Sequence, residues 1–138
     1  MKTKIILSLC FSLICSLMFL GCTKDEPVDT LVNINIIGKW EIESRLTNNI
    51  SNMAVLCCEF IEFKTDENIE DYLGLFQSES SNLINNGTFE VNVNDKTILI
   101  DLGNRQLLCD YSINADKLNL IYTDENNDTI DEIWKKVE

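Results

Sequence analysis

Apolar and polar residues alternate along most of the chain after residue 36, which is the pattern of half-buried β-strands. In residues 38–46 one face carries Trp40, Ile42 and Leu46, and the other carries Lys39, Glu41, Glu43 and Arg45. Seven further strand-like stretches follow, at residues 57–64, 69–75, 87–93, 97–102, 106–113, 117–123 and 129–137. The pattern therefore predicts eight strands and an all-β domain.

Short, turn-rich connections separate most of these stretches, at residues 94–95, 103–104, 114–116 and 124–128. Such regular spacing favours an antiparallel sandwich or barrel. Closing the sheet on itself removes its two exposed edges, so we predict a small up-and-down barrel of eight strands over residues 36–138. Two longer connections, at 47–56 and 76–86, are each expected to hold a helical turn or a flap.

The N-terminal segment has a different character. Lys2 and Lys4 precede sixteen uncharged residues at positions 5–20, an arrangement typical of a secretory signal peptide. A retained membrane helix, which needs about 20 apolar residues, is the alternative. Residues 22–35 contain the only proline and are predicted to form a tether. The chain thus divides into a signal peptide (1–21), a tether (22–35) and one domain (36–138).

The end of the signal peptide resembles a bacterial lipobox, since Phe19, Leu20 and Gly21 precede Cys22. The resemblance implies a lipid-modified Cys22, and two or three acyl chains make a stable membrane anchor. The following Lys24-Asp25-Glu26 resembles the surface-export signal of lipoproteins from some Gram-negative gut anaerobes. It implies an outer-membrane lipoprotein facing the cell exterior, with the periplasmic face as the alternative.

Charge and composition exclude several classes of function. The chain has 23 acidic and 11 basic residues and a net charge of −12, and removal of residues 1–21 takes away two lysines. Such a surface repels nucleic-acid phosphates, so we expect no nucleic-acid partner. The chain has no histidine, which removes the usual zinc-finger patterns and the usual triad base. We predict no catalytic residue, no metal site and no cofactor, and therefore no enzyme.

Six cysteines are present, and Cys10 and Cys15 lie in the predicted signal peptide. Besides Cys22, the mature chain would keep Cys57, Cys58 and Cys109. A disulfide between Cys109 and either Cys57 or Cys58 is one prediction for an oxidising compartment. Buried free thiols are the alternative, because cysteine often behaves as a small apolar residue.

The start of the domain, Gly38-Lys39-Trp40, resembles the Gly-x-Trp signature of lipocalins and their relatives. Residues 87–89, a Gly-Thr-Phe strand opening, add to a resemblance to the lipocalin-like domains of small bacterial lipoproteins. It implies that Trp40 plugs one end of the barrel. Lipocalins place an arginine over that tryptophan, whereas this chain has Lys135 and Lys136 near its end. A lysine can still lie over an indole face.

The resemblance and the aromatic content together suggest a ligand. We predict a small apolar or amphipathic ligand in the barrel, with these residues as candidate cavity lining or core: Trp40, Ile42, Phe60, Phe89 and Tyr111. The alternative is a barrel filled by its own side chains, acting as a non-enzymatic interaction module whose loops contact a protein or glycan. Thr30, after Asp29, resembles an O-glycosylation site of the same bacterial group.

Overall fold

The computed structural model describes residue 31 and residues 34–51, 58–68 and 71–137, which form strands and turns without a helix. The strands are β1 (Gly38–Thr47), β2 (Ile50–Ser51), β3 (Phe60–Thr65), β4 (Leu73–Ser80), β5 (Leu83–Asn92), β6 (Thr97–Asp101), β7 (Gln106–Asn114), β8 (Lys117–Thr123) and β9 (Thr129–Lys136). No helix in this part of the chain is long and apolar enough to cross a membrane.

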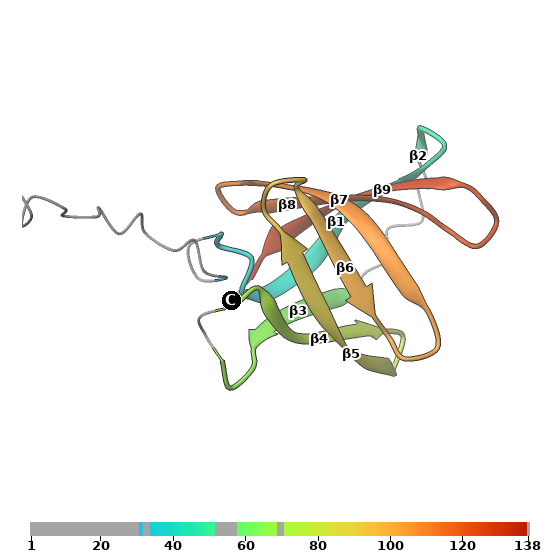
Figure 1. Cartoon of the computed structure of the whole chain (residues 1–138). Coiled ribbons are helices and arrows are strands. Elements are labelled where there is room, and N and C mark those ends of the chain that lie inside the picture. Colours follow the sequence, from blue (N-terminus) through green and yellow to red (C-terminus); the bar gives the residue numbers. More distant parts are fainter. Residues whose placement is uncertain (1–30, 32–33, 52–57, 69–70, 138) are drawn as a thin grey trace, which may run out of the picture.

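All the strands belong to one antiparallel sheet with the order β2-β1-β3-β4-β5-β6-β7-β8-β9, and β9 pairs back to β1 (Figure 1). Eight strands therefore close into a barrel. The two-residue β2 is an addition that pairs only with the end of β1. This architecture confirms the predicted all-β, eight-stranded antiparallel barrel, and it is consistent with a lipocalin-like barrel.

The prediction of a helical turn or flap at residues 76–86 is wrong. β4 and β5 run through this stretch, and only Ser81 and Asn82 lie between them. Both have positive φ angles, 46° and 72°, as the two central residues of a tight hairpin turn require. The other long connection, 47–56, contains β2 at its start, and its residues 52–57 lie outside the described part of the chain.

One end of the barrel is packed solid around aromatic rings. Phe63 makes edge-to-face contacts with Phe76 and Phe89, at centroid distances of 5.3 and 4.9 Å. Gly74 lies opposite Phe89, and a Cβ atom at Gly74 would come within 2.4 Å of that ring. The glycine thus makes room for the phenylalanine.

The same end is closed by the residues just before β1. Trp40 is fully buried, together with Leu31 and Ile36. Its indole Nε1 donates a hydrogen bond to the carbonyl oxygen of Ile36 at 2.9 Å. Lys136 Nζ lies 5.2 Å from the centre of the Trp40 ring, where a cation is attracted to the π-face. Trp40 therefore plugs this end of the barrel, with a lysine over its ring.

A β-bulge reverses the two faces of β1 halfway along its length. Ile42 pairs with Trp134 but Ser44 pairs with Ile133, which leaves one extra residue, Glu43, in β1. Because side chains alternate between faces, one extra residue exchanges the inward and outward positions beyond it. The predicted face of Trp40, Ile42 and Leu46 is therefore wrong beyond the bulge, since Arg45 now shares the inner face with Glu132.

Candidate functional site

The half of the barrel away from Trp40 encloses a cavity of about 240 Å³, to which all eight barrel strands contribute. Its position follows from the pairing of β1 with β9, since Trp40 lies opposite Lys136 and Arg45 opposite Glu132, further along both strands. The inner surface near the packed end is apolar, and its residues include Ile61, Phe76, Ile100, Cys109, Leu120 and Trp134. We call this surface the apolar floor.

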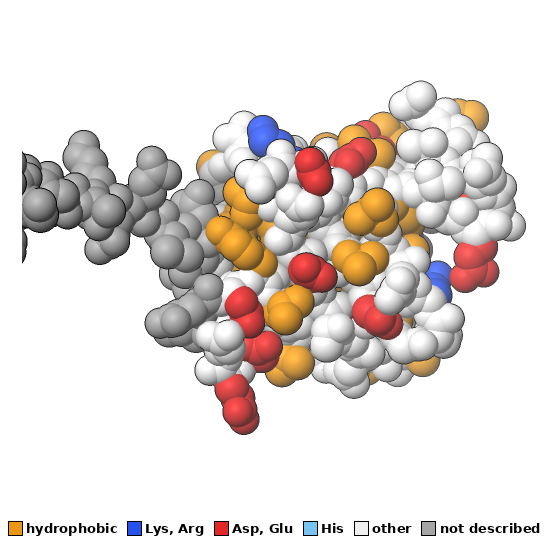
Figure 2. All heavy atoms as spheres, viewed as in Figure 1, with side chains coloured by type: hydrophobic (Ala, Val, Ile, Leu, Met, Phe, Trp, Pro, Cys, Tyr) orange, Lys and Arg blue, Asp and Glu red, His pale blue; other side chains and the backbone are white. Residues whose placement is uncertain are grey.

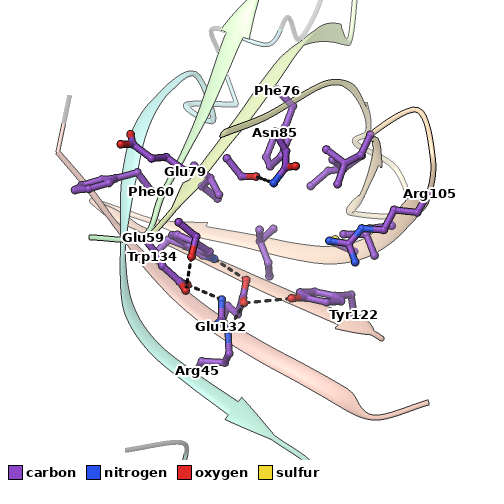
Figure 3. Close-up of a pocket in the computed structure, with 18 residues that line it drawn as sticks. Arg45, Glu59, Phe60, Phe76, Glu79, Asn85, Arg105, Tyr122, Glu132 and Trp134 are labelled. Atoms are coloured by element: carbon purple, nitrogen blue, oxygen red, sulfur yellow. Dashed lines mark hydrogen bonds and ion pairs between the residues drawn. The ribbon is translucent and has the colours of Figure 1, made fainter. Parts of the chain in front are cut away.

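Charged and hydroxyl-bearing side chains form one side of the cavity (Figure 3). We call it the ionic wall, and it consists of Arg45, Glu59, Ser80, Tyr122 and Glu132. These residues come from β1, the residue before β3, the end of β4, β8 and β9. The wall therefore joins distant parts of the sequence that only barrel closure brings together.

Glu132 is the buried acid of the ionic wall, and 3% of its surface is exposed. Its Oε1 accepts hydrogen bonds from Arg45 Nε at 2.6 Å and Tyr122 Oη at 3.2 Å. Its Oε2 accepts one from Trp134 Nε1 at 3.1 Å. A buried carboxylate is costly unless it is paired and hydrogen-bonded, and three donors from three strands meet this requirement.

Arg45 links that buried acid to a second carboxylate, that of the partly buried Glu59. Its Nη2 lies 2.9 Å from Glu59 Oε2, and Ser80 Oγ donates to Glu59 Oε1 at 3.0 Å. Burial lowers the pKa of Arg45, but the charges of Glu132 and Glu59 outweigh this effect and raise it overall. Burial and the charge of Glu132 also raise the pKa of Tyr122. The guanidinium thus stays charged and the phenol stays protonated.

Most of the residues predicted from the sequence as cavity lining or core do not line this cavity. Trp40 and Phe89 belong to the packed end, and Ile42 and Tyr111 are partly buried against the core. Phe60 borders the cavity, but its ring points away from it (Figure 3) and Lys39 Nζ lies 4.5 Å from the ring centre. Four of the five predicted residues therefore belong to the core or pack against it, and only Phe60 borders the cavity.

Sequence reasoning missed the ionic wall, although one of its members left a signal. In the last strand Glu132 falls in the same alternating phase as Ile130 and Trp134, both of which are buried. An acid in the apolar phase of a strand indicates a buried charge with a partner. No comparable signal marked Arg45, because the bulge that turns it inward is not visible in the sequence.

The cysteine and modification sites are only partly within the described residues. Cys109 is a buried thiol on the apolar floor, whereas Cys58 is exposed, and the structure has no disulfide between these two. Cys57, Cys22 and Thr30 lie outside the described residues, so their predicted roles stay predictions. Burial, followed by the charges of Glu132 and Asp110, raises the pKa of Cys109 to about 12.

Cys109 should resist alkylation by iodoacetamide at pH 8 in the native protein and react once the protein is unfolded, because burial removes both access and thiolate. Its raised pKa also makes the folded state lose stability as pH rises from about 9 towards 12, since the unfolded chain forms the thiolate first. Mass spectrometry of the alkylated protein measures the first effect.

Alkylation under denaturing, non-reducing conditions separates the two cysteine predictions. Labelling of Cys57, Cys58 and Cys109 would support free thiols. Labelling of only one of the three would show a disulfide that includes Cys109 or joins the vicinal pair, and peptide mapping would identify it. A native Cys109 that reacts as fast as an unfolded one would contradict its buried position.

Within the described residues, no cluster of three or more acidic or cysteine side chains is arranged to hold a metal ion. A scan of protein-family models and searches of curated proteins and of solved structures gave no match. The class of the molecule therefore rests on its own geometry. It is a closed, eight-stranded antiparallel barrel, solid at one end, with a cavity at the other.

Proposed function

We propose that the barrel is a non-enzymatic binding module whose cavity holds a small amphipathic molecule. The observation that carries the proposal is the division of the cavity into an apolar floor and a polar side that includes the ionic wall. Ligand sites commonly combine a mostly apolar lining with a few placed polar groups. The apolar part of the ligand would contact Ile61, Phe76 and Trp134, and its polar head would face Arg45 and Glu59.

The size of the cavity limits the ligand. At about 240 Å³ it lies below the roughly 300 to 1,000 Å³ of pockets for drug-sized ligands. It is also several times larger than the ~30 Å³ that one water molecule occupies in the liquid. The ligand is therefore small, or only one end of a longer molecule enters the barrel.

A substitution that fills the cavity should abolish binding. Ser78 of β4 lines the cavity, so Ser78→Leu places a larger apolar side chain in the binding space. Ser112 of β7 is exposed outside the barrel, so Ser112→Leu is the matched control. An apolar dye or short-chain amphiphile at 100 times its dissociation constant should stabilise the wild-type and Ser112→Leu proteins by about 2.7 kcal/mol. It should not stabilise Ser78→Leu.

Thermal melting with a panel of such probes measures this effect. If the proteins melt normally and no probe raises the melting temperature of the wild type, the binding proposal fails. Equal stabilisation of all three proteins would mean that the probes bind outside the cavity.

We also propose that the barrel is anchored in the outer membrane by lipid on Cys22 and faces the cell exterior. The support is the N-terminal sequence, namely the basic start, the apolar run, the lipobox-like residues before Cys22 and the Lys24-Asp25-Glu26 segment. One acyl chain binds a membrane only marginally, whereas two or three hold stably.

Cys22→Ala should abolish acyl-chain labelling in the native host and leave either uncleaved precursor or unanchored protein. Metabolic labelling with an alkyne fatty acid, followed by membrane fractionation, measures this. Cys58→Ala is the control, and it should label like the wild type. Persistent labelling of the Cys22→Ala protein would contradict the proposed anchor.

A second candidate, an interaction module that contacts a protein or glycan through its loops, is favoured by exposed apolar residues near the hairpin turns at the cavity end. Ile50 of β2 is 70% exposed, and Leu83 and Ile84 next to the β4–β5 turn are also exposed. On the face in Figure 2, acidic side chains separate the hydrophobic ones. A partner would therefore contact these hairpins rather than a continuous apolar sheet face.

A further inference from the structure

The charges around the cavity do not balance. In the ionic wall, one guanidinium, that of Arg45, faces two carboxylates, those of Glu59 and Glu132. Arg105, at the margin of the cavity, lies 3.6 Å from the exposed Glu125. Arg105 lines the cavity at this margin and is paired with Glu125 in an exposed ion pair. The ionic wall itself has two carboxylates for one guanidinium, an excess of one negative charge.

The carboxylate of Glu59 has unused hydrogen-bonding capacity. A carboxylate can accept about four hydrogen bonds, and Glu59 accepts one on each oxygen, from Arg45 and Ser80. Its side chain is 13% exposed and lines the cavity. A donor entering the cavity can therefore bond to Glu59 without displacing either partner.

A ligand with an acidic head group could instead bind to Arg45, but the neighbouring carboxylates of Glu59 and Glu132 disfavour it. Arg45 keeps further N–H groups, since its Nε bonds to Glu132 and its Nη2 to Glu59. An anion bound to those groups would be a third carboxylate beside two that already outnumber the guanidinium. Like charges placed together in a desolvated site discriminate strongly against a ligand.

The rest of the cavity suits the body of an organic cation. Phe76, Tyr122 and Trp134 line it, and aromatic rings attract alkylammonium groups as well as alkyl chains. The indole Nε1 of Trp134 and the hydroxyl of Tyr122 already donate to Glu132. The donor groups of these two side chains are therefore already used, and unused acceptor capacity remains on Glu59.

We infer that the cavity selects a small amphipathic cation, an alkyl or arylalkyl amine whose ammonium group bonds to Glu59, over a carboxylate of the same shape. The inference rests on the proposed binding function and names the class of its ligand.

The test uses three probes of matched shape, hexylamine, hexanol and hexanoate, titrated at pH 7 into the full-length protein in a neutral detergent. The Ser78→Leu protein supplies the background from detergent and from surface binding. Isothermal titration calorimetry should give a dissociation constant for hexylamine at least about tenfold below that for hexanoate, with hexanol between them. Binding of hexanoate as tight as, or tighter than, that of hexylamine would overturn the inference while supporting a binding cavity.

A charge-neutral variant assigns the preference to one residue. Glu59→Gln should remove most of the preference for hexylamine, and Glu90→Gln, on the exposed outer side of β5, should leave it unchanged. A preference that persists in a folded Glu59→Gln protein would overturn the role of Glu59. If none of the three probes binds, the inference fails. The dye panel with Ser78→Leu then decides separately whether the cavity binds any ligand.

Discussion

Trp40→Ala should lower the free energy of unfolding by about 3 to 5 kcal/mol, the usual cost of removing a large buried aromatic side chain. The indole is fully buried, bonds to the Ile36 carbonyl and lies beneath Lys136. Its removal would open the packed end of the barrel and free the segment that contains Leu31 and Ile36. Since small domains are stable by about 5 to 15 kcal/mol, urea denaturation should show a greatly reduced midpoint.

Glu41→Ala is the matched control, because Glu41 is the exposed neighbour of Trp40 on the outer face of β1. It should change the midpoint little. If the two substitutions are equally mild, Trp40 does not close the barrel and the lipocalin-like interpretation loses its main support.

Arg45→Met should cost about 3 kcal/mol, because it leaves the buried Glu132 without its counter-charge. Breaking a buried ion pair on one side typically costs about 3 to 5 kcal/mol. The lower end applies here, since the Arg45 side chain is 26% exposed and Tyr122 and Trp134 still donate to Glu132. Equilibrium unfolding in urea, monitored by tryptophan fluorescence, measures the loss.

Adding Glu132→Gln to Arg45→Met should restore part of the lost stability, because the remaining buried group is then neutral. The comparison pair is Lys117 and Glu43, which are joined at 2.6 Å but are both exposed. Lys117→Met should change stability little, since exposed ion pairs contribute little. An Arg45→Met protein as stable as Lys117→Met would mean that the ionic wall does not hold Glu132 in place.

The barrel could be predicted from the sequence because most strands keep a strict alternation. Residues 97–102 and 117–123 have apolar or aromatic side chains at each inward position. Ile98, Ile100, Leu118 and Leu120 are buried, and Leu102 and Tyr122 are partly buried. The alternation gives no information on a bulge, since one extra residue leaves the composition unchanged. Arg45 therefore looked like an outward charge until the pairing of β1 with β9 placed it inside.

The cavity itself weakened the sequence signal for β4 and β5. Inward positions near the β4–β5 turn carry Ser78, Ser80 and Asn85, which line the cavity instead of filling a core. A strand that faces a polar cavity loses its apolar phase, and the resulting run of serines and asparagines resembles a loop. The stretch 76–86 was thus predicted wrongly because it lines the candidate site.

The candidate site residues show a related limit. Alternation identifies the inward face of a strand but not the height of a residue along the barrel. Trp40 and Phe89 were predicted as lining or core, and the structure places them at the packed end. The height depends on the stagger of neighbouring strands, which is set by pairing across the whole sheet.

The closed end of the barrel has a consequence for where a ligand comes from. Leu31 and Ile36, which lead into β1, are buried at the end that Trp40 plugs, and the cavity lies towards the other end. If Cys22 carries lipid as proposed, the chain that leads from the anchor enters the domain at the end opposite the cavity. Under the proposed anchoring, we expect the cavity to take up its ligand from the surrounding water rather than from the lipid, so ligand exchange should not depend on the composition of the membrane.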